Sequence, residues 1–374
     1  MIVDNVQPSG LASGLKMDWQ TYRVMICPLC EHGLIANDDR HFFRAVSRAS
    51  HLTDDLFHMD YDMCKRCGLI YQYTFPTDES LLNYYKTLYR PGEDIYTPSP
   101  KETQIEMKRA RDWVRWLTQT QDFEKEYYKP RGIPARHIDI GSSTGSLGGL
   151  LRFYGTRYSI GVEPGPWAKW SERHLHQVVP DMGNLPKELY RTFDLVTMSH
   201  TLEHFKDPVS ELLRARRLMK PDGRILIAVP DIHRKFASIF AFPHLLIFSH
   251  RTLKMLLYLA GFEIVSRRFF GPDLAVIAKL AEPKYTIKPP LPFFKSKIFL
   301  FWRLHEEYNI LTHWTSRRYW PESQGYPPKL FARLSFILSE RYISLRGFFS
   351  TSLFLFRYLF LRATKKLERD PKPE

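Results

Sequence analysis

The stretch HIDIGSSTGSLGGLL, residues 137–151, carries the strongest structural signal in this chain of 374 residues. It begins as an apolar run typical of a buried strand and ends with the spacing of an amphipathic helix. Glycines at positions 141, 145 and 148 mark the turn between them, where the backbone bends sharply or approaches another group closely. A strand, a glycine-rich turn and a helix in this order are typical of a nucleotide-binding α/β domain.

Two common nucleotide-binding loops do not fit this turn. A phosphate-binding P-loop requires Gly-Lys-Ser/Thr after the glycines, whereas Gly145 is followed by Ser146 and Leu147. The dinucleotide fingerprint requires Gly-x-Gly-x-x-Gly, and the middle position here is Ser143. The turn therefore belongs to another kind of loop.

The run Asp139-Ile140-Gly141-Ser142-Ser143-Thr144-Gly145 resembles motif I of the class I S-adenosylmethionine (SAM)-dependent methyltransferases, D/E-x-G-x-G-x-G, with Ser143 replacing the middle glycine. SAM carries a sulfonium, an ammonium and a ribose, so its loop needs close backbone approach and carboxylate acceptors rather than a lysine. The resemblance implies that Asp139, Gly141, Ser143 and Gly145 lie at the cofactor.

Further family features follow in order within about residues 100–281. Glu163 stands 22 residues beyond Gly141, at the end of the next predicted strand, where a carboxylate can accept both ribose hydroxyl protons. The resemblance assigns the remaining cofactor contacts to Asp181 and Met182 at adenine, with Asn184 as the alternative, and to Ser199 and His200 at the methionine end.

Strand-like and helical runs alternate between about residues 91 and 281, the pattern of a parallel sheet covered on both faces. Together with the resemblance, this predicts an α/β fold with a Rossmann-like, seven-stranded sheet. The segment KPDG, residues 220–223, is predicted to form a type I turn. Two final β-like runs, 262–270 and 274–280, are close enough to pair antiparallel.

The four cysteines form two pairs, Cys27-x-x-Cys30 and Cys64-x-x-Cys67. Four thiolates have the number and softness that tetrahedral Zn²⁺ requires, so we expect a zinc-ribbon-like module with a structural ion. Two redox pairs and incidental buried cysteines are the alternatives.

Candidate catalytic residues follow the fourth predicted strand of the sheet. In the string Leu202-Glu203-His204, the histidine is placed to orient or deprotonate a methyl acceptor, although relatives also use this pair only to brace the loop. His244 falls in a segment that covers the acceptor pocket in relatives, and its alternative is a packed or solvated histidine.

The segment CKRCGLIYQYTFPTDESLLNYYKTLY, residues 64–89, resembles the N-terminal zinc module of bacterial methyltransferases associated with surface-glycan or modified-sugar synthesis. The resemblance implies a sugar, nucleotide-sugar or glycan acceptor and O- or C-methylation. Sugar C-methyltransferases of this kind carry a further C-terminal α/β domain that this chain does not obviously have. An RNA or protein methyltransferase and a non-catalytic SAM-fold scaffold are the alternatives.

Net charge divides the chain unevenly. Of the formal +14, residues 284–374 contribute 17 Lys and Arg against 7 Asp and Glu, a net +10. This distribution disfavours a nucleic-acid partner, because the charge lies in an apolar, aromatic tail and not around the cysteines. We predict a zinc module over 1–90, the methyltransferase domain over 91–281, and a mainly helical extension over 282–374.

The tail segment 348–361, FFSTSLFLFRYLFL, is flanked by arginines and lysines. As a helix it would extend about 21 Å, too short for a hydrocarbon core of about 30 Å. It suits peripheral contact with an anionic membrane, and packing on the catalytic domain or in a dimer is the alternative. The N-terminus lacks the apolar core of a signal peptide, so we expect a cytoplasmic protein, with peripheral contact at the inner face of the membrane if the tail binds lipid. The sequence does not predict an oligomeric state.

Overall fold

The computed structural model describes residues 20–31, 43–48, 56–64, 66–87, 89, 98, 100–119, 134–232, 239 and 242–284. Residues Met1–Leu291 form one compact unit and Pro292–Glu374 another, and every described residue belongs to the first. Residues 285–374, which make up nearly all of the predicted helical extension and include its segment 348–361, lie outside the described residues.

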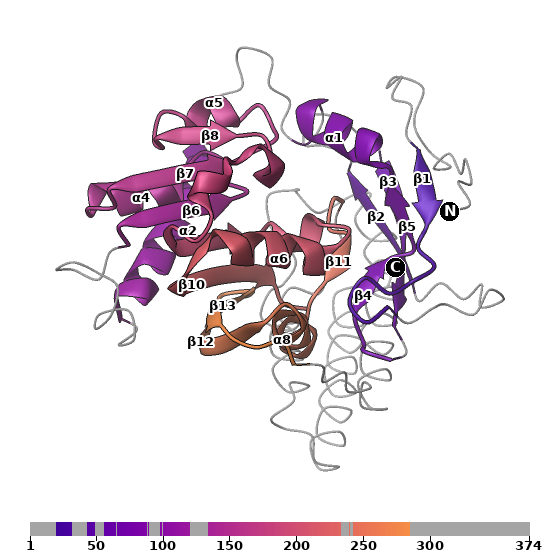
Figure 1. Cartoon of the computed structure of the whole chain (residues 1–374). Coiled ribbons are helices and arrows are strands. Elements are labelled where there is room, and N and C mark those ends of the chain that lie inside the picture. Colours follow the sequence, from indigo (N-terminus) through magenta and orange to yellow (C-terminus); the bar gives the residue numbers. More distant parts are fainter. Residues whose placement is uncertain are drawn as a thin grey trace, which may run out of the picture. The chain divides into compact units, whose positions relative to one another are not determined.

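A seven-stranded sheet forms the centre of the described unit, in the order β12-β13-β10-β9-β6-β7-β8 (Figure 1). Strands β10, β9, β6, β7 and β8 pair in parallel, whereas β13 runs antiparallel to both β10 and β12. The predicted seven-stranded Rossmann-like sheet and its antiparallel final pair are therefore confirmed. The strands are β6 (Arg136–Ile140), β7 (Tyr158–Val162), β8 (Gln177–Val179), β9 (Phe193–Ser199), β10 (Met219–Pro230), β12 (Phe262–Phe270) and β13 (Asp273–Leu280).

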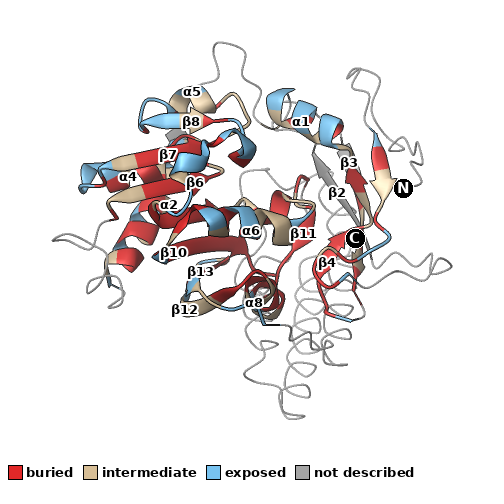
Figure 2. Ribbon diagram, viewed as in Figure 1, coloured by how far each residue is buried: buried red, intermediate tan, exposed pale blue. Residues whose placement is uncertain are grey.

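Helices cover both faces of this sheet, and the alternation along β10 shows how. Leu226 and Ala228 pack with Trp113 of α2 in one cluster of buried residues, whereas Ile225 and Ile227 belong to the other. Side chains two apart share a face of a strand, so each face of β10 meets its own layer. Because both faces are covered, most of the central strands are coloured red, for buried residues, in Figure 2. The helices are α2 (Pro100–Gln119), α4 (Ser146–Phe153), α5 (Ala168–Ser171), α6 (Pro208–Leu218) and α8 (His250–Leu259).

Strand β10 begins at Met219, before the turn predicted at residues 220–223 and not after it. These residues continue β10, and the register against β9 shifts between Met219, opposite Phe193, and Arg224, opposite Leu195. The chain bulges at this point instead of reversing, which accommodates a proline that has no N–H to give to the ladder.

The N-terminal part forms two small sheets. β1 (Thr21–Arg23) pairs with β5 (Thr74–Pro76), and a four-stranded sheet has the order β11-β4-β3-β2. Its first strand, β11, lies in the sequence between β10 and α8 of the methyltransferase domain, so a strand pairing with β4 joins this part of the chain to the N-terminal module. The remaining elements are β2 (Phe43–Arg48), β3 (Leu56–Met63), β4 (Ile70–Gln72), α1 (Asp78–Thr87) and β11 (Leu246–Ile247).

No helix in the described part of the chain combines the length and the apolar character needed to cross a bilayer.

Candidate functional site

The motif I loop lies at the carboxyl end of β6, next to β9, where the strand order of the sheet reverses. Open α/β sheets bind ligands at such a switch point. Gly141 has φ +80°, and a Cβ there would lie 2.2 Å from the Thr201 hydroxyl oxygen. Ser143 has φ +51°, so the residue that departs from the family pattern adopts the left-handed conformation that glycine enters without strain. The substitution therefore keeps the form of the turn.

Glu163 follows β7 and reaches the same loop. Its Oε2 accepts a hydrogen bond from the Ser143 backbone N–H at 2.8 Å, and its Oε1 accepts from the Gly165 N–H at 2.9 Å. A carboxylate offers about four acceptor positions, so it can serve these amides and two ribose hydroxyls together. The structure brings Glu163 to the loop as the sequence predicts.

Glu106 of α2 is a third acidic residue at this loop, and sequence reasoning missed it. The Ser143 hydroxyl donates to its Oε1 at 2.5 Å, and the Thr144 hydroxyl donates to its Oε2. The only sequence signal is an acid on the helix before motif I, 37 residues away from Ser143, and nothing local shows that this helix returns to the loop. With Asp139 and Glu163, it gives the loop the carboxylates that suit a ligand carrying a sulfonium and an ammonium.

Asp139, in β6, is buried, and the Thr197 hydroxyl donates to its Oδ1 at 2.6 Å. Burial raises the pKa of Asp139 to about 7, against the opposing effect of the Thr197 hydrogen bond and with a smaller contribution from Glu106 and Glu163. A cation bound at the loop would favour the ionised form of this carboxyl, because opposite charges attract more strongly where water is excluded.

The other predicted cofactor residues have structural partners of their own. Asp181 is exposed, and its Oδ1 accepts from the Gly183 N–H at 2.6 Å and the Asn184 N–H at 3.2 Å, while Met182 is buried. The Ser199 hydroxyl accepts from the Trp113 indole N–H at 3.2 Å. Their contacts to adenine and to the methionine end of SAM stay predictions.

His200, at the end of β9, lies between two carboxylates. Its Nε2 is 3.0 Å from Asp273 Oδ2, and its Nδ1 is 3.6 Å from Glu203 Oε1. Burial would lower the pKa of His200, but these two carboxylates raise it above its ordinary value. Its backbone has φ +56°, an uncommon conformation outside glycine. The buried pair of anions therefore favours an imidazolium at the edge of the motif I site.

Glu203, His204 and His244 come together, although 40 positions separate the two histidines. His204 Nε2 lies 3.9 Å from Glu203 Oε1, and the two imidazole rings are 5.1 Å apart. Glu203 is 1% exposed, and neither of its carboxylate oxygens accepts a hydrogen bond from a described residue. Burial would raise its pKa, yet the interaction with His200 and the charges of His204 and His244 lower it to about 2.

A buried carboxylate facing two imidazoles can assist proton transfer. The three residues also offer one ligand atom each within 4.8 Å of one another, so they could hold a cation. All three were predicted as candidate catalytic residues, and the structure brings them into one cluster.

Tyrosines of the N-terminal module lie against this cluster, and sequence reasoning missed them too. The rings of Tyr85 and Tyr89 lie 6.3 and 6.2 Å from that of His204, and Tyr84 packs edge-on against Phe242 at 4.6 Å. Burial raises the pKa of Tyr85 well above its ordinary value, with Tyr89, Tyr84, Glu163 and Glu203 adding to the effect. A neutral phenol thus stands near both the cofactor loop and the histidines. Its only signal in the sequence is the repeated tyrosine of NYYKTLY.

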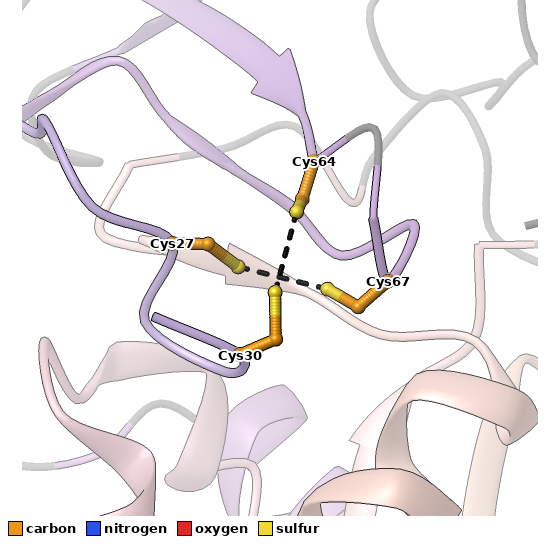
Figure 3. Close-up of side chains that lie close together, drawn as sticks. All are labelled: Cys27, Cys30, Cys64 and Cys67. Atoms are coloured by element: carbon orange, nitrogen blue, oxygen red, sulfur yellow. Dashed lines mark hydrogen bonds between the residues drawn. The ribbon is translucent and has the colours of Figure 1, made fainter. Parts of the chain in front are cut away.

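The four cysteines also converge, in the N-terminal module (Figure 3). The Sγ atoms of Cys27 and Cys67 are 3.6 Å apart and those of Cys30 and Cys64 are 3.5 Å apart, so each knuckle faces the other. These separations exceed the ~2.05 Å of a disulfide. They approach the ~3.8 Å that four Zn–S bonds of ~2.3 Å impose in a tetrahedron.

The backbone of the two knuckles is also alike. The residue after each second cysteine has positive φ, +54° at Glu31 and +80° at Gly68, and its N–H bonds to the carbonyl of the first cysteine. The Leu69 N–H points at the Cys67 sulfur at 3.4 Å. The donor set and its backbone therefore fit a tetrahedral thiophilic ion.

Residues 108–267 match a family model described as "Methyltransferase domain". The sheet domain is a SAM-dependent methyltransferase domain. The matched residues run from within α2 to within β12, and they include the motif I loop, Glu163 and Glu203. The prediction of an enzyme of this class is confirmed.

Solved structures of SAM-dependent methyltransferases are similar in fold at low sequence identity. One from Aquifex aeolicus is 14% identical, with 48% of this chain and 93% of that chain covered and a TM-score of 0.37. One from Leishmania major is 15% identical, with 54% and 82% covered and a TM-score of 0.41. A protein from Pyrococcus horikoshii is 14% identical, with 49% and 92% covered and a TM-score of 0.39. A search of curated proteins found no match. No substrate follows from similarities at this level.

Proposed function

We propose that this methyltransferase transfers the SAM methyl group to a sugar or glycan acceptor, at an oxygen or at a carbon. The supporting observation is the cluster of buried Glu203 and His204 with half-buried His244, which lies against Tyr85 of α1. A sugar hydroxyl is weakly acidic, so its methylation benefits from a positioned base, and the cluster offers one.

When bound, SAM supplies an electrophilic methyl group, and its transfer leaves S-adenosylhomocysteine. His204 takes the acceptor proton as the new bond forms. Glu203, ionised and 3.9 Å from His204 Nε2, stabilises the imidazolium that results. His244 and Tyr85 orient the acceptor, and Tyr85 does so as a hydrogen-bond donor, because a phenol with an ordinary pKa of about 10 is protonated at neutral pH. Positioning of the reactants supplies much of the remaining acceleration.

The proposal extends to the metal. Cys27, Cys30, Cys64 and Cys67 would hold one Zn²⁺ by their thiolates, and the ion would tie the strands of the N-terminal module together. Four protein ligands leave no open position, so this ion would serve structure and not the transfer step.

The membrane hypothesis stays a proposal about the tail, which lies outside the described residues. An apolar segment flanked by cations would bring a cytoplasmic enzyme to the inner face of an anionic membrane, where lipid-linked glycans are assembled. An RNA or protein acceptor is the alternative to a sugar.

A panel of acceptors tests the proposed function. The full chain is incubated with SAM and, separately, with nucleotide-sugars, glycan fragments, tRNA and a basic protein, and each product is examined by mass spectrometry. We expect the mass increase of one methylene unit on a sugar only. Methylation of tRNA or protein, with none on any sugar, would refute the acceptor class.

The His204→Ala variant then tests the base. It should lower the rate on that sugar by about 10²–10⁴ and leave SAM affinity nearly intact. A His204→Ala variant with full turnover would show that His204 only braces its loop.

A further inference from the structure

Two buried side chains of the N-terminal module converge on one carbonyl oxygen of the acceptor-side loop. The Tyr61 hydroxyl donates to His244 O at 3.0 Å, and Gln72 Nε2 donates to the same oxygen at 2.9 Å. Tyr61 is fully buried and Gln72 is 4% exposed. Tyr61 of β3 and Gln72 of β4 are paired opposite each other, so neighbouring positions of the small sheet supply both hydrogen-bond donors.

The chain after His244 is held from two sides. The Gln72 N–H donates to Leu245 O at 2.8 Å, and the Leu245 N–H donates to the backbone O of Glu203 at 2.9 Å. Strand β11 then continues the pairing, with Leu246 opposite Tyr71. The loop of His244 is therefore fixed between the N-terminal module and the Glu203–His204 turn.

The His244 ring itself is oriented by a backbone carbonyl. Its Nδ1 lies 2.7 Å from Ile239 O, and a carbonyl only accepts, so Nδ1 carries the proton. Nε2 is then the basic nitrogen of the ring. Since the backbone of His244 is fixed by Tyr61 and Gln72, the direction of that nitrogen depends on the N-terminal module.

We infer that Tyr61 and Gln72 are positioning residues of the acceptor site, which set the place of His244 relative to Glu203 and His204. The inference rests on the proposed function for its kinetic consequence. Its structural consequence, a change in the environment of the His244 ring, does not depend on which acceptor is used. Through Tyr61 and Gln72, the N-terminal module thereby influences methyl transfer by way of His244 and not by way of the cofactor loop.

The test uses the full chain with Tyr61→Phe, Gln72→Met and the double variant, each of which keeps size and removes a donor. Tyr71→Phe is the matched control, because Tyr71 is a buried tyrosine of the same sheet whose hydroxyl bonds to no described residue. The imidazole ¹⁵N resonances of His244 are assigned by comparison with His244→Asn, and they can be recorded without any methyl acceptor. SAM affinity is measured by calorimetry, and kcat is measured on the sugar found in the panel.

We expect the His244 resonances to shift in both single variants and not in Tyr71→Phe. The kcat should fall about five- to tenfold in each and about 10²-fold in the double variant, with SAM affinity within twofold of the parent. Unchanged His244 resonances overturn the inference, and so does an equal loss of kcat in Tyr71→Phe. If no sugar is methylated, the proposed function fails, while the His244 resonances still decide the inference.

Discussion

The Glu163→Gln substitution is the sharpest test of the cofactor site. The Glu163 carboxylate accepts from two backbone amides, Ser143 at 2.8 Å and Gly165 at 2.9 Å, which aims it along the motif I loop. Glutamine keeps the shape but removes the charge and places an NH₂ donor where the loop presents another donor. Hydrogen bonds to a charged group are worth about 1.5–3 kcal/mol each, and some of the loss is recovered by the remaining amide oxygen.

The affinity of Glu163→Gln for SAM should therefore fall by about 2–3 kcal/mol, or about 30- to 150-fold in Kd. Calorimetric titration at one salt concentration measures this, after circular dichroism has shown that the variant is folded. The matched control is Glu172→Gln, which removes the same charge from an exposed position just after α5 and should change Kd less than twofold. A folded Glu163→Gln variant with the parent affinity would remove Glu163 from the ribose site. An equal loss in Glu172→Gln would attribute the effect to net charge.

Three further predictions concern the metal, a buried acid and the tail. Protein purified without chelator should contain one zinc per chain and Cys64→Ser should contain much less; absence of zinc from the parent protein would reject the metal site. Burial raises the pKa of Asp139 to about 7, so the protonated side chain stabilises the fold fully below about pH 4, and this contribution is lost as the pH rises through 7. Asparagine does not titrate. The Tm of Asp139→Asn should therefore increase relative to that of the SAM-free parent between pH 4 and pH 8. A Tm difference that stays constant over this range would contradict the raised pKa. The full chain should co-sediment with anionic but not neutral vesicles, more weakly at high salt, and should lose this on truncation after Pro328; equal behaviour of the two forms would exclude membrane contact by the tail.

The sequence by itself determined the motif I turn, the order of the elements in the methyltransferase domain and the two cysteine knuckles. Each depends on neighbours along the chain. A left-handed turn at Gly141 and a strand such as 262–270, which the structure reproduces residue for residue, follow from local sterics and from the periodicity of apolar side chains. The segment 220–223 shows the limit of such local signals. Local turn chemistry marks it as a break, and the structure makes it a bulge within β10, between the pairs Met219–Phe193 and Arg224–Leu195.

Only the tertiary structure decided what completes the site. Glu106 reaches the motif I loop because α2 packs back over the sheet, and Tyr85 meets His204 because the N-terminal module borders the main domain. The hydrogen bond from Tyr61 to His244 O joins positions 183 residues apart. No local pattern encodes such contacts, because they arise when apolar faces of distant elements bury against each other and carry their polar side chains along.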